Sequence, residues 1–165
     1  MIENLKFEPM ICGDTNSVVQ IIAKSMNENE GRWANKTINF HYFCQNSGVS
    51  DGRIYYVAKI NEQIVGISGL HSYEWGPEDL SWLGWFAVDP DFQGKKIGYF
   101  LMQNTIELAK QKGFRKLLIE TYSDKDFEKA RNFYERYGFH QIGKIEGYIA
   151  KQIDMVVFGL ELNQS

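Results

Sequence analysis

Hydrophobic and polar positions along the first half of the chain follow two different periods. Apolar residues between Val18 and Met26 recur at the spacing of one helical face behind Asp14, a favourable N-cap, which predicts a helix over residues 14–28. The following stretch, 29–36, is polar and is expected to form a loop. The remaining apolar runs predict strands over 5–11, 53–60 and 64–73 and a short helix over 37–46.

The second half alternates more sharply between strands and helices. Residues 80–88 are apolar at nearly every position, the pattern of a strand covered on both faces. An amphipathic helix is expected over 96–112 and a strand over 116–122. The stretch from Ser123 to Asp126 matches a capping box and predicts that another helix begins there. That helix carries an apolar stripe, and a strand hairpin is expected after it; the residues concerned are Phe127, Ala130, Phe133, Tyr134 and Tyr137 on the helix, then strands 139–148 and 151–162.

The order of these elements is β α α β β β α β α β β. Such a mixture indicates an α/β (or α+β) fold class built around a mixed sheet. The chain has 165 residues and contains no repeat, low-complexity tract or Pro/Ser-rich linker, so we expect a single domain over residues 1–165.

Composition narrows the class of protein. With 44% apolar and 24% charged residues the chain is neither disordered nor membrane-like, and its longest clean apolar run, 82–88, is far shorter than the roughly 20 residues of a membrane span. The start of the chain has no signal-peptide pattern. Cys12 and Cys44 form no CxxC motif, so both are expected to be buried thiols of a cytoplasmic protein. The histidines are scattered, so no metal site is expected; they are His41, His71 and His140.

Charge is distributed unevenly around a net value of −3. Residues 1–90 carry six Lys or Arg against eleven Asp or Glu, whereas residues 91–116 carry six against two. The basic segment indicates either an anion site or a solvated helix with lysines at its end. Because the basic residues and aromatic rings form no long shared face, a nucleic-acid partner is not expected.

The segment from Val88 to Gly98 carries the strongest chemical signal. A strand ends, a glycine-containing loop follows and a helix begins, so unpaired N–H groups at the helix start could bind phosphate. Gly94 and Gly98 lack a Cβ that would keep a diphosphate from the backbone, and two lysines add positive charge. Neither a Walker A motif nor a GxGxxG fingerprint is present. From the residues alone, a phosphate site and an ordinary strand-to-helix turn both remain open.

This segment resembles the cofactor motif of the GCN5-related N-acetyltransferase (GNAT) family, V-x-P-x-x-[QR]-G-x-G-x-[GA]-x-x-L. Lys96 stands where the family usually has glycine, and we expect it to adopt an ordinary helical φ. A second segment, 130–139, resembles the family's A-x-x-[FL]-Y-x-x-x-G-F motif. The matching residues are Val88, Pro90, Gln93, Gly94, Gly98 and Leu101 in the first motif and Ala130, Phe133, Tyr134, Gly138 and Phe139 in the second.

The resemblance implies the fold and the acyl donor. Members of the family have one domain with a mixed, mostly antiparallel sheet of six to seven strands, helices on both faces and a splayed pair of parallel strands, here 80–88 and 116–122. Acetyl-CoA would bind in this gap as cosubstrate, without a metal, so the acetyl-CoA-binding core would be about 80–140 and the acceptor side about 1–50. The implied donor contacts are Phe86, Ala87, Val88, Gln93, Gly94, Lys95, Lys96, Ile97, Gly98 and Asn132.

The resemblance also implies that Tyr134 is the general acid that protonates the CoA thiolate; otherwise it is one more ring of the aromatic stripe. The base is left open because strand 80–88 contains no carboxylate; Glu120, His71 or a water chain could serve. Acidic groups and aromatic rings suit an amine acceptor, although packing explains them equally well. The acceptor contacts so expected are Glu28, Glu30, Trp33, Tyr73 and Trp82.

The expected activity is acetyl-CoA-dependent transfer of an acetyl group to a primary amine of a small molecule or peptide, by direct attack on the thioester. Two alternatives stay open. One is a non-catalytic acyl-CoA-binding or sensing module on the same fold. The other is an unrelated α/β domain that binds a nucleotide or phosphate. Neither the acyl-chain preference nor the oligomeric state follows from the sequence, and strand 151–162 could pair across a homodimer.

Overall fold

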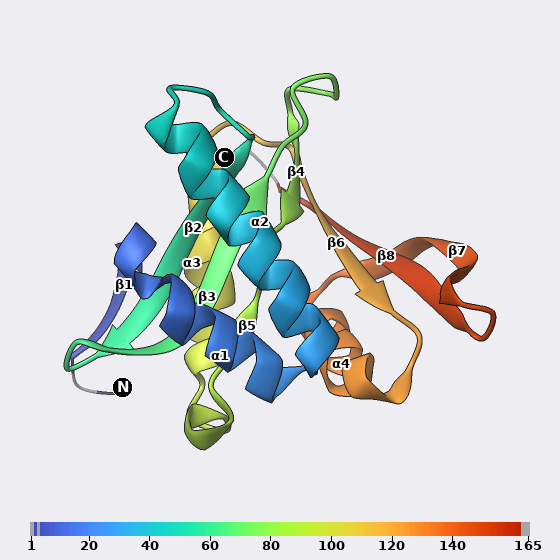
Figure 1. The fold of residues 1–165 in the computed structure, drawn as a ribbon. Coiled ribbons are helices and arrows are strands. Elements are labelled where there is room, and N and C mark those ends of the chain that lie inside the picture. The colour runs from blue at the N-terminus through green and yellow to red at the C-terminus, as the bar shows by residue number, and fades with distance from the viewer. Residues whose placement is uncertain (1, 3, 163–165) are drawn as a thin grey trace.

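One mixed β-sheet organises the chain in the computed structural model, which describes residue 2 and residues 4–162 (Figure 1). The N-terminal strands and helices are β1 (Leu5–Pro9), α1 (Thr15–Ser25), α2 (Glu28–Asn46), β2 (Arg53–Ile60) and β3 (Gln63–His71). The rest are β4 (Leu80–Leu83), β5 (Ala87–Val88), α3 (Ile97–Gln111), β6 (Lys116–Tyr122), α4 (Glu128–Tyr137), β7 (His140–Ala150) and β8 (Ile153–Glu161). Short 3₁₀ turns at Cys12–Asp14, Pro90–Phe92 and Lys125–Phe127 precede α1, α3 and α4.

The strands run in the order β1-β2-β3-β4-β6-β8-β7, with β5 paired only to β3. The contact between β4 and β6 is parallel, and each of the other described pairs is antiparallel. The expected mixed, mostly antiparallel sheet with a parallel pair is therefore confirmed. The expected single strand over 80–88 is wrong, because Gly84–Phe86 interrupt it and divide it into β4 and β5.

Helices cover both faces of the sheet, as expected (Figure 1). On one face, Val18 and Ile22 of α1 and Ile38 of α2 form a buried cluster with Val57 and Ile67 of the sheet. On the other, α3 and α4 contribute to a second buried cluster with β6 and β8. The β7–β8 hairpin extends away from this body, and every residue of β7 is exposed.

The expected loop over 29–36 is wrong, because α2 runs without interruption from Glu28 to Asn46. Asn27 caps the helix by accepting a hydrogen bond from the Glu30 N–H at 3.0 Å. The polar residues of this stretch lie on the solvent side of the helix, while Glu30, Gly31 and Ala34 are buried. Polar composition here reflects an exposed helix face rather than a loop.

The capping box expected at 123–126 does not form. The Ser123 hydroxyl accepts a hydrogen bond from the Asp154 N–H of β8 at 2.8 Å instead of capping the helix. A 3₁₀ turn therefore precedes α4, which begins at Glu128. A tertiary contact has displaced the local one.

Candidate active site

A cleft of about 810 Å³ lies among the two helical layers and the interrupted strand. Its walls come from α1 and α2 on one side, from β6 and α4 on the other, and from the loop before α3 at one end. The expected donor and catalytic contacts that line it are Phe86, Ala87, Val88, Gln93, Gly94, Lys96, Ile97, Gly98, Tyr134, Glu120 and His71. The topology thus brings together residues that are up to 63 positions apart in sequence.

The interruption between β4 and β5 leaves backbone groups unpaired inside this cleft. Gly84 N–H donates to the Gly69 carbonyl at 2.8 Å, whereas the N–H groups of Trp85 and Phe86 donate to no other described residue. The Trp85 indole N–H donates to the Thr37 hydroxyl at 2.7 Å and so ties the interruption to α2. Unpaired N–H groups beside a parallel strand pair can bind the amides of an extended ligand.

The loop before α3 is shaped by local hydrogen bonds. Asp89 accepts from the Asp91 N–H at 3.0 Å, and the Gln93 side-chain amide donates to the Val88 carbonyl at 3.2 Å. Gly94 and Lys96 both have positive φ, +78° and +64°, and α3 begins directly afterwards. The expectation that Lys96 takes an ordinary helical φ is therefore wrong. The position keeps the left-handed conformation of a glycine, at a cost of about 1 kcal/mol.

The basic residues at this end of the cleft are not all the ones that the sequence indicated. Lys96, Lys129 and Arg136 line the cleft. The side chain of Lys95, an expected donor contact, does not line the cleft; its ammonium lies over the Phe92 ring, 4.7 Å from the centroid. Lys129 of α4 was missed; it donates to the Gln93 side-chain oxygen at 2.5 Å and therefore stands beside the loop.

Asn132, expected to contact the donor, is exposed and does not line the cleft. It lies on the outer side of α4, where its carbonyl accepts from Arg136 Nε at 3.0 Å. Tyr134, two residues further along this helix, faces inward instead. The helical period places the two side chains on different sides.

Tyr134 is 5% exposed and packs against aromatic rings. Its ring centroid lies 6.3 Å from that of Phe86 and 5.9 Å from that of Phe133. Its side chain lines the cleft. Burial raises the pKa of Tyr134 well above its usual value of 10, so the phenol holds its proton at neutral pH.

Glu30 of α2 is the buried acid of the cleft, at 6% exposed. Its carboxylate has no ion pair or hydrogen bond within residues 2 and 4–162. Burial, with smaller contributions from Glu120 and Asp124, raises the pKa of Glu30 to about 7. A carboxylate with this pKa can accept a proton near neutral pH.

The two base candidates taken from the sequence differ from Glu30 and from each other. Glu120 is exposed and accepts a hydrogen bond from the Tyr122 hydroxyl at 3.0 Å. His71 is half-buried, and burial together with the nearby Arg53 lowers its pKa to about 4. A base with so low a pKa is weak at neutral pH, so the chemistry favours Glu30 over His71.

Of the expected acceptor contacts, only Glu30 lines the cleft. Glu28 and Trp33 lie on the exposed side of α2, and the Tyr73 ring packs on His71, 4.6 Å between centroids, with 43% of it exposed. Trp82 points away from the cleft, between Ser81 and Leu83, which are both buried. Four of the expected acceptor contacts thus lie outside the cleft lining, because an assignment by composition ignores which face of each element turns inward.

Several cleft residues were missed. Thr121 is 3% exposed, and its hydroxyl is unpaired among the described residues. Tyr122 shares its strand face with Glu120, a relation that the period of two could have revealed. Arg53 and Thr37 carry no sequence signal, because only the packing of α2 against β2 brings them into the cleft.

Among the described residues, no cluster of three or more His, Cys, Asp or Glu side chains is arranged to bind a metal ion. The same residues include no helix with the length and hydrophobicity to cross a bilayer.

Comparison with curated proteins gives partial matches. Probable N-acetyltransferase camello of Xenopus laevis is 33% identical over 91 residues, which are 55% of this chain and 40% of that protein. An uncharacterized N-acetyltransferase of Methanocaldococcus jannaschii is 37% identical over 62 residues, 38% of this chain and 26% of that protein. The matched regions therefore span less than half the length of these relatives.

Solved structures match over nearly the whole chain. A GNAT-family protein of Desulfovibrio desulfuricans has a TM-score of 0.85 at 20% identity, covering 96% of this chain and 99% of that one. A GNAT-family acetyltransferase of Elizabethkingia anophelis with acetyl-CoA bound has a TM-score of 0.73 at 20% identity, covering 97% and 99%. The profile of the Acetyltransferase (GNAT) family matches residues 17–139. The chain therefore belongs to the GNAT family of acetyltransferases, as its two sequence motifs predicted.

Proposed function

We propose that the protein transfers an acetyl group from acetyl-CoA to a primary amine of a small molecule or peptide, by direct attack of the amine on the thioester. The observation that carries this proposal is the cleft in which unpaired N–H groups, a loop with two left-handed residues and a buried tyrosine adjoin. The Elizabethkingia anophelis relative was solved with acetyl-CoA bound, which supports the same donor here. We place the acceptor side at about residues 1–50 and the donor core at about 80–140 of a single domain.

The donor is held by the backbone of the interrupted strand and the loop. The N–H groups of Trp85 and Phe86 bind the pantetheine amides. The N–H groups from Gly94 to Gly98, at the start of α3, bind the diphosphate, whereas the Gln93 N–H donates to the Pro90 carbonyl; Lys96 and Lys129 add positive charge. The Thr121 hydroxyl is free among the described residues to accept or donate a further hydrogen bond.

Bound acetyl-CoA supplies an activated acetyl group on a thioester. The protein's own task is then to move two protons. Glu30 accepts a proton from the acceptor ammonium, and the more exposed Glu120 carboxylate attracts the cation before that transfer. Tyr134 keeps its proton and donates it to the departing thiolate. The backbone N–H near Val88 offers a donor for the developing oxyanion.

The test is release of CoA thiol from acetyl-CoA with a panel of primary amines, together with calorimetric binding of acetyl-CoA. We expect turnover with at least one class of amine. Binding without turnover on any amine would favour a non-catalytic acyl-CoA-binding module, and absence of both would reject the proposal.

The matched variant for this test is Tyr134→Phe, which removes only the hydroxyl. Loss of the proton donor should lower kcat about ten-fold or more, with little change in acetyl-CoA affinity. Since the ring contacts with Phe86 and Phe133 remain, the variant should fold like the parent protein. An unchanged kcat would show that another group protonates the thiolate.

A further inference from the structure

Arg53, the first residue of β2, places a cation in the part of the cleft that adjoins α2 and β3. Its side chain is 22% exposed. Glu30 and Arg53 line the same cleft, so the cleft contains both a buried carboxyl group and a largely buried guanidinium. The donor-binding roles proposed above do not use Arg53.

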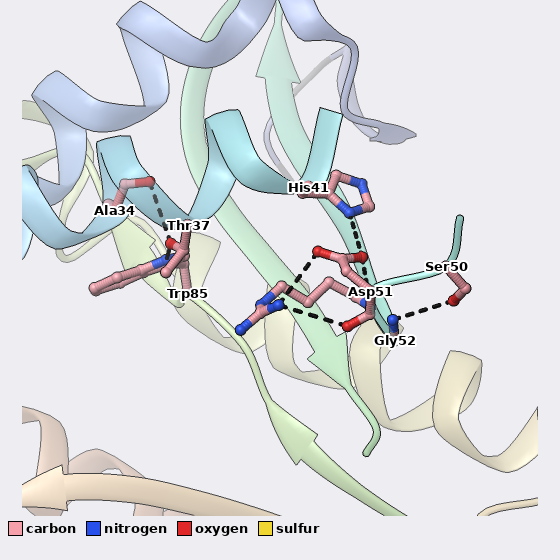
Figure 2. A network of polar contacts seen from close by, with 8 residues as sticks. Ala34, Thr37, His41, Ser50, Asp51, Gly52 and Trp85 are labelled. Atoms are coloured by element: carbon pink, nitrogen blue, oxygen red, sulfur yellow. Dashed lines mark hydrogen bonds and ion pairs between the residues drawn. The ribbon is translucent and has the colours of Figure 1, made fainter. Parts of the chain in front are cut away.

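A buried network holds this guanidinium in place. Asp51 accepts from one terminal nitrogen of Arg53 at 3.2 Å, and His41 Nδ1 lies 2.8 Å from the other Asp51 oxygen. Figure 2 shows His41 reaching down from α2 to Asp51 in the turn that leads into β2. The side chains of His41 and Asp51 are each 4% exposed.

The charges in this network support one another. Burial alone would raise the pKa of Asp51, but hydrogen bonds with His41 and with Arg53 outweigh burial and hold that pKa below its usual value. The His41 ring also packs edge-on against Tyr42 and Tyr55, both at 5.1 Å between centroids. Buried ion pairs contribute little to stability on average, so what the network provides is a fixed position for Arg53.

Only part of the guanidinium is occupied. One terminal nitrogen makes both contacts with Asp51, to its carboxylate and to its carbonyl. In the described part of the chain, Nε and the second terminal nitrogen have no acceptor. Neighbouring N–H groups of one guanidinium bind the two oxygens of a carboxylate in parallel.

The helix α2 sets the distance between the acidic and the basic region. Glu30, Thr37 and His41 fall on one side of α2, because they are spaced by seven and then four residues. Eleven residues of helix rise about 16 Å, so the Glu30 carboxylate and the network around Arg53 lie at separate ends of the same wall. Trp85, whose indole N–H donates a hydrogen bond to Thr37, lies between these two ends.

We propose that the acceptor is an amine that also carries a carboxylate, and that Arg53 binds this carboxylate while the amine faces Glu30 and Glu120. The inference rests on the proposed function and narrows its acceptor class. Neutral His71 lies opposite Arg53 across the β2–β3 pair and can donate a further hydrogen bond. An extended chain of about ten or more bonds between amine and carboxylate, as in long ω-amino acids and short peptides, fits the separation along α2.

The experiment compares acceptors in matched pairs that differ only in a carboxylate or a carboxamide. Pairs of long ω-amino acids and of tri- and tetrapeptides are assayed with saturating acetyl-CoA by release of CoA thiol. We expect kcat/KM to be about ten-fold or more higher for the acids, because a charge-assisted bidentate contact is lost with the amides. Equal values of kcat/KM for acids and amides would overturn the inference and leave the proposed function intact.

Variants at Arg53 test whether this side chain causes the preference for acids over amides. Arg53→Gln should reduce the ratio of kcat/KM for the acids to kcat/KM for the amides to about two-fold or less, because KM should rise more for the acids than for the amides. Arg53→Lys keeps the charge and should retain part of the preference, which also covers the case in which the Gln variant does not fold. Arg32→Gln, which removes an exposed cation on the outer side of α2, is the control and should change nothing. A ratio that survives in folded Arg53→Gln would overturn the assignment, and absence of turnover with every amine would reject the proposed function and this inference together.

Discussion

Among single residues, the buried Glu30 carboxylate links stability to pH. Its pKa is about 7 in the folded chain and about 4.5 in an unfolded chain, so between these values the folded state binds one more proton. The free energy of unfolding should therefore fall as pH rises from 4.5 to 7, because the carboxylate must ionise in a buried site beside Glu120 and Asp124. Above pH 7 this contribution is constant.

The variant Glu30→Gln isolates that contribution. An uncharged amide resembles protonated Glu30, so the variant and the parent should be similar in stability at pH 5. At pH 8 the variant should be more stable, since the parent then holds a buried charge. Urea unfolding at both pH values measures the difference, and a gap that does not widen with pH would contradict the assignment.

Lys96 has a backbone conformation that favours glycine. Alanine usually stabilises a helix more than glycine does, but at this position we expect the glycine variant to be the more stable one. At φ +64°, a Cβ costs about 1 kcal/mol, so Lys96→Gly should be about 1 kcal/mol more stable than Lys96→Ala. At an ordinary helical φ the alanine variant would be the more stable one. Both variants lack the lysine side chain, so chemical denaturation compares the backbone effect alone. A more stable alanine variant would argue against the left-handed conformation.

At the scale of elements, the packing of α1 against α2 depends on Gly31. A Cβ at this position would lie 2.7 Å from the Cβ of Ala23, closer than real contacts allow. Gly31→Ala should therefore destabilise the chain by about 1–3 kcal/mol, although alanine improves helix propensity by about 1 kcal/mol. Thermal or urea unfolding measures the change. Lys36→Ala, exposed on the same helix, is the control and should stay within about 0.5 kcal/mol.

The elements also show where sequence patterns suffice. Strands β2 and β6 have the predicted bounds, because alternating or continuous apolar residues end at clear turn signals. Nearly half of α2, residues 28–36, was missed, since its polar residues face solvent and only Glu30, Gly31 and Ala34 reveal its buried side. The interruption at Gly84–Phe86 was missed too, because residues on both sides of it are equally apolar.

The candidate site likewise contains residues that the sequence could locate and residues that it could not. The loop before α3 and Tyr134 could be located because a resemblance in motif fixes positions along the chain. Arg53, Lys129 and Thr121 could not, because they reach the cleft through tertiary packing between elements that are distant in sequence. Trp33 and Asn132 are exposed and do not line the cleft, and the sequence pattern alone does not show on which side of a helix they lie.

Over the whole molecule, the positions of the charged residues say more about the cleft than the net charge does. The basic segment 91–116 contains six Lys or Arg, but of its lysines next to the loop only Lys96 lines the cleft. Lys129 and Arg136, from the later acidic third of the chain, complete the basic end. The acidic first half supplies Glu30, and β6 supplies Glu120. The cleft therefore collects charges that no single segment of the sequence contains.

Because that cleft touches both helical layers and the interrupted strand, the proposed donor should stabilise the entire fold. A ligand that binds only the folded state at 100 times its Kd adds about 2.7 kcal/mol, which raises Tm by roughly 5–10 °C for a chain of this size. Acetyl-CoA should produce such a shift in a thermal unfolding assay. Lys129→Gln should reduce it by weakening diphosphate binding, whereas Lys110→Gln, at the far end of α3, should leave it unchanged. If acetyl-CoA at millimolar concentration leaves Tm unaltered, the cleft does not bind this donor.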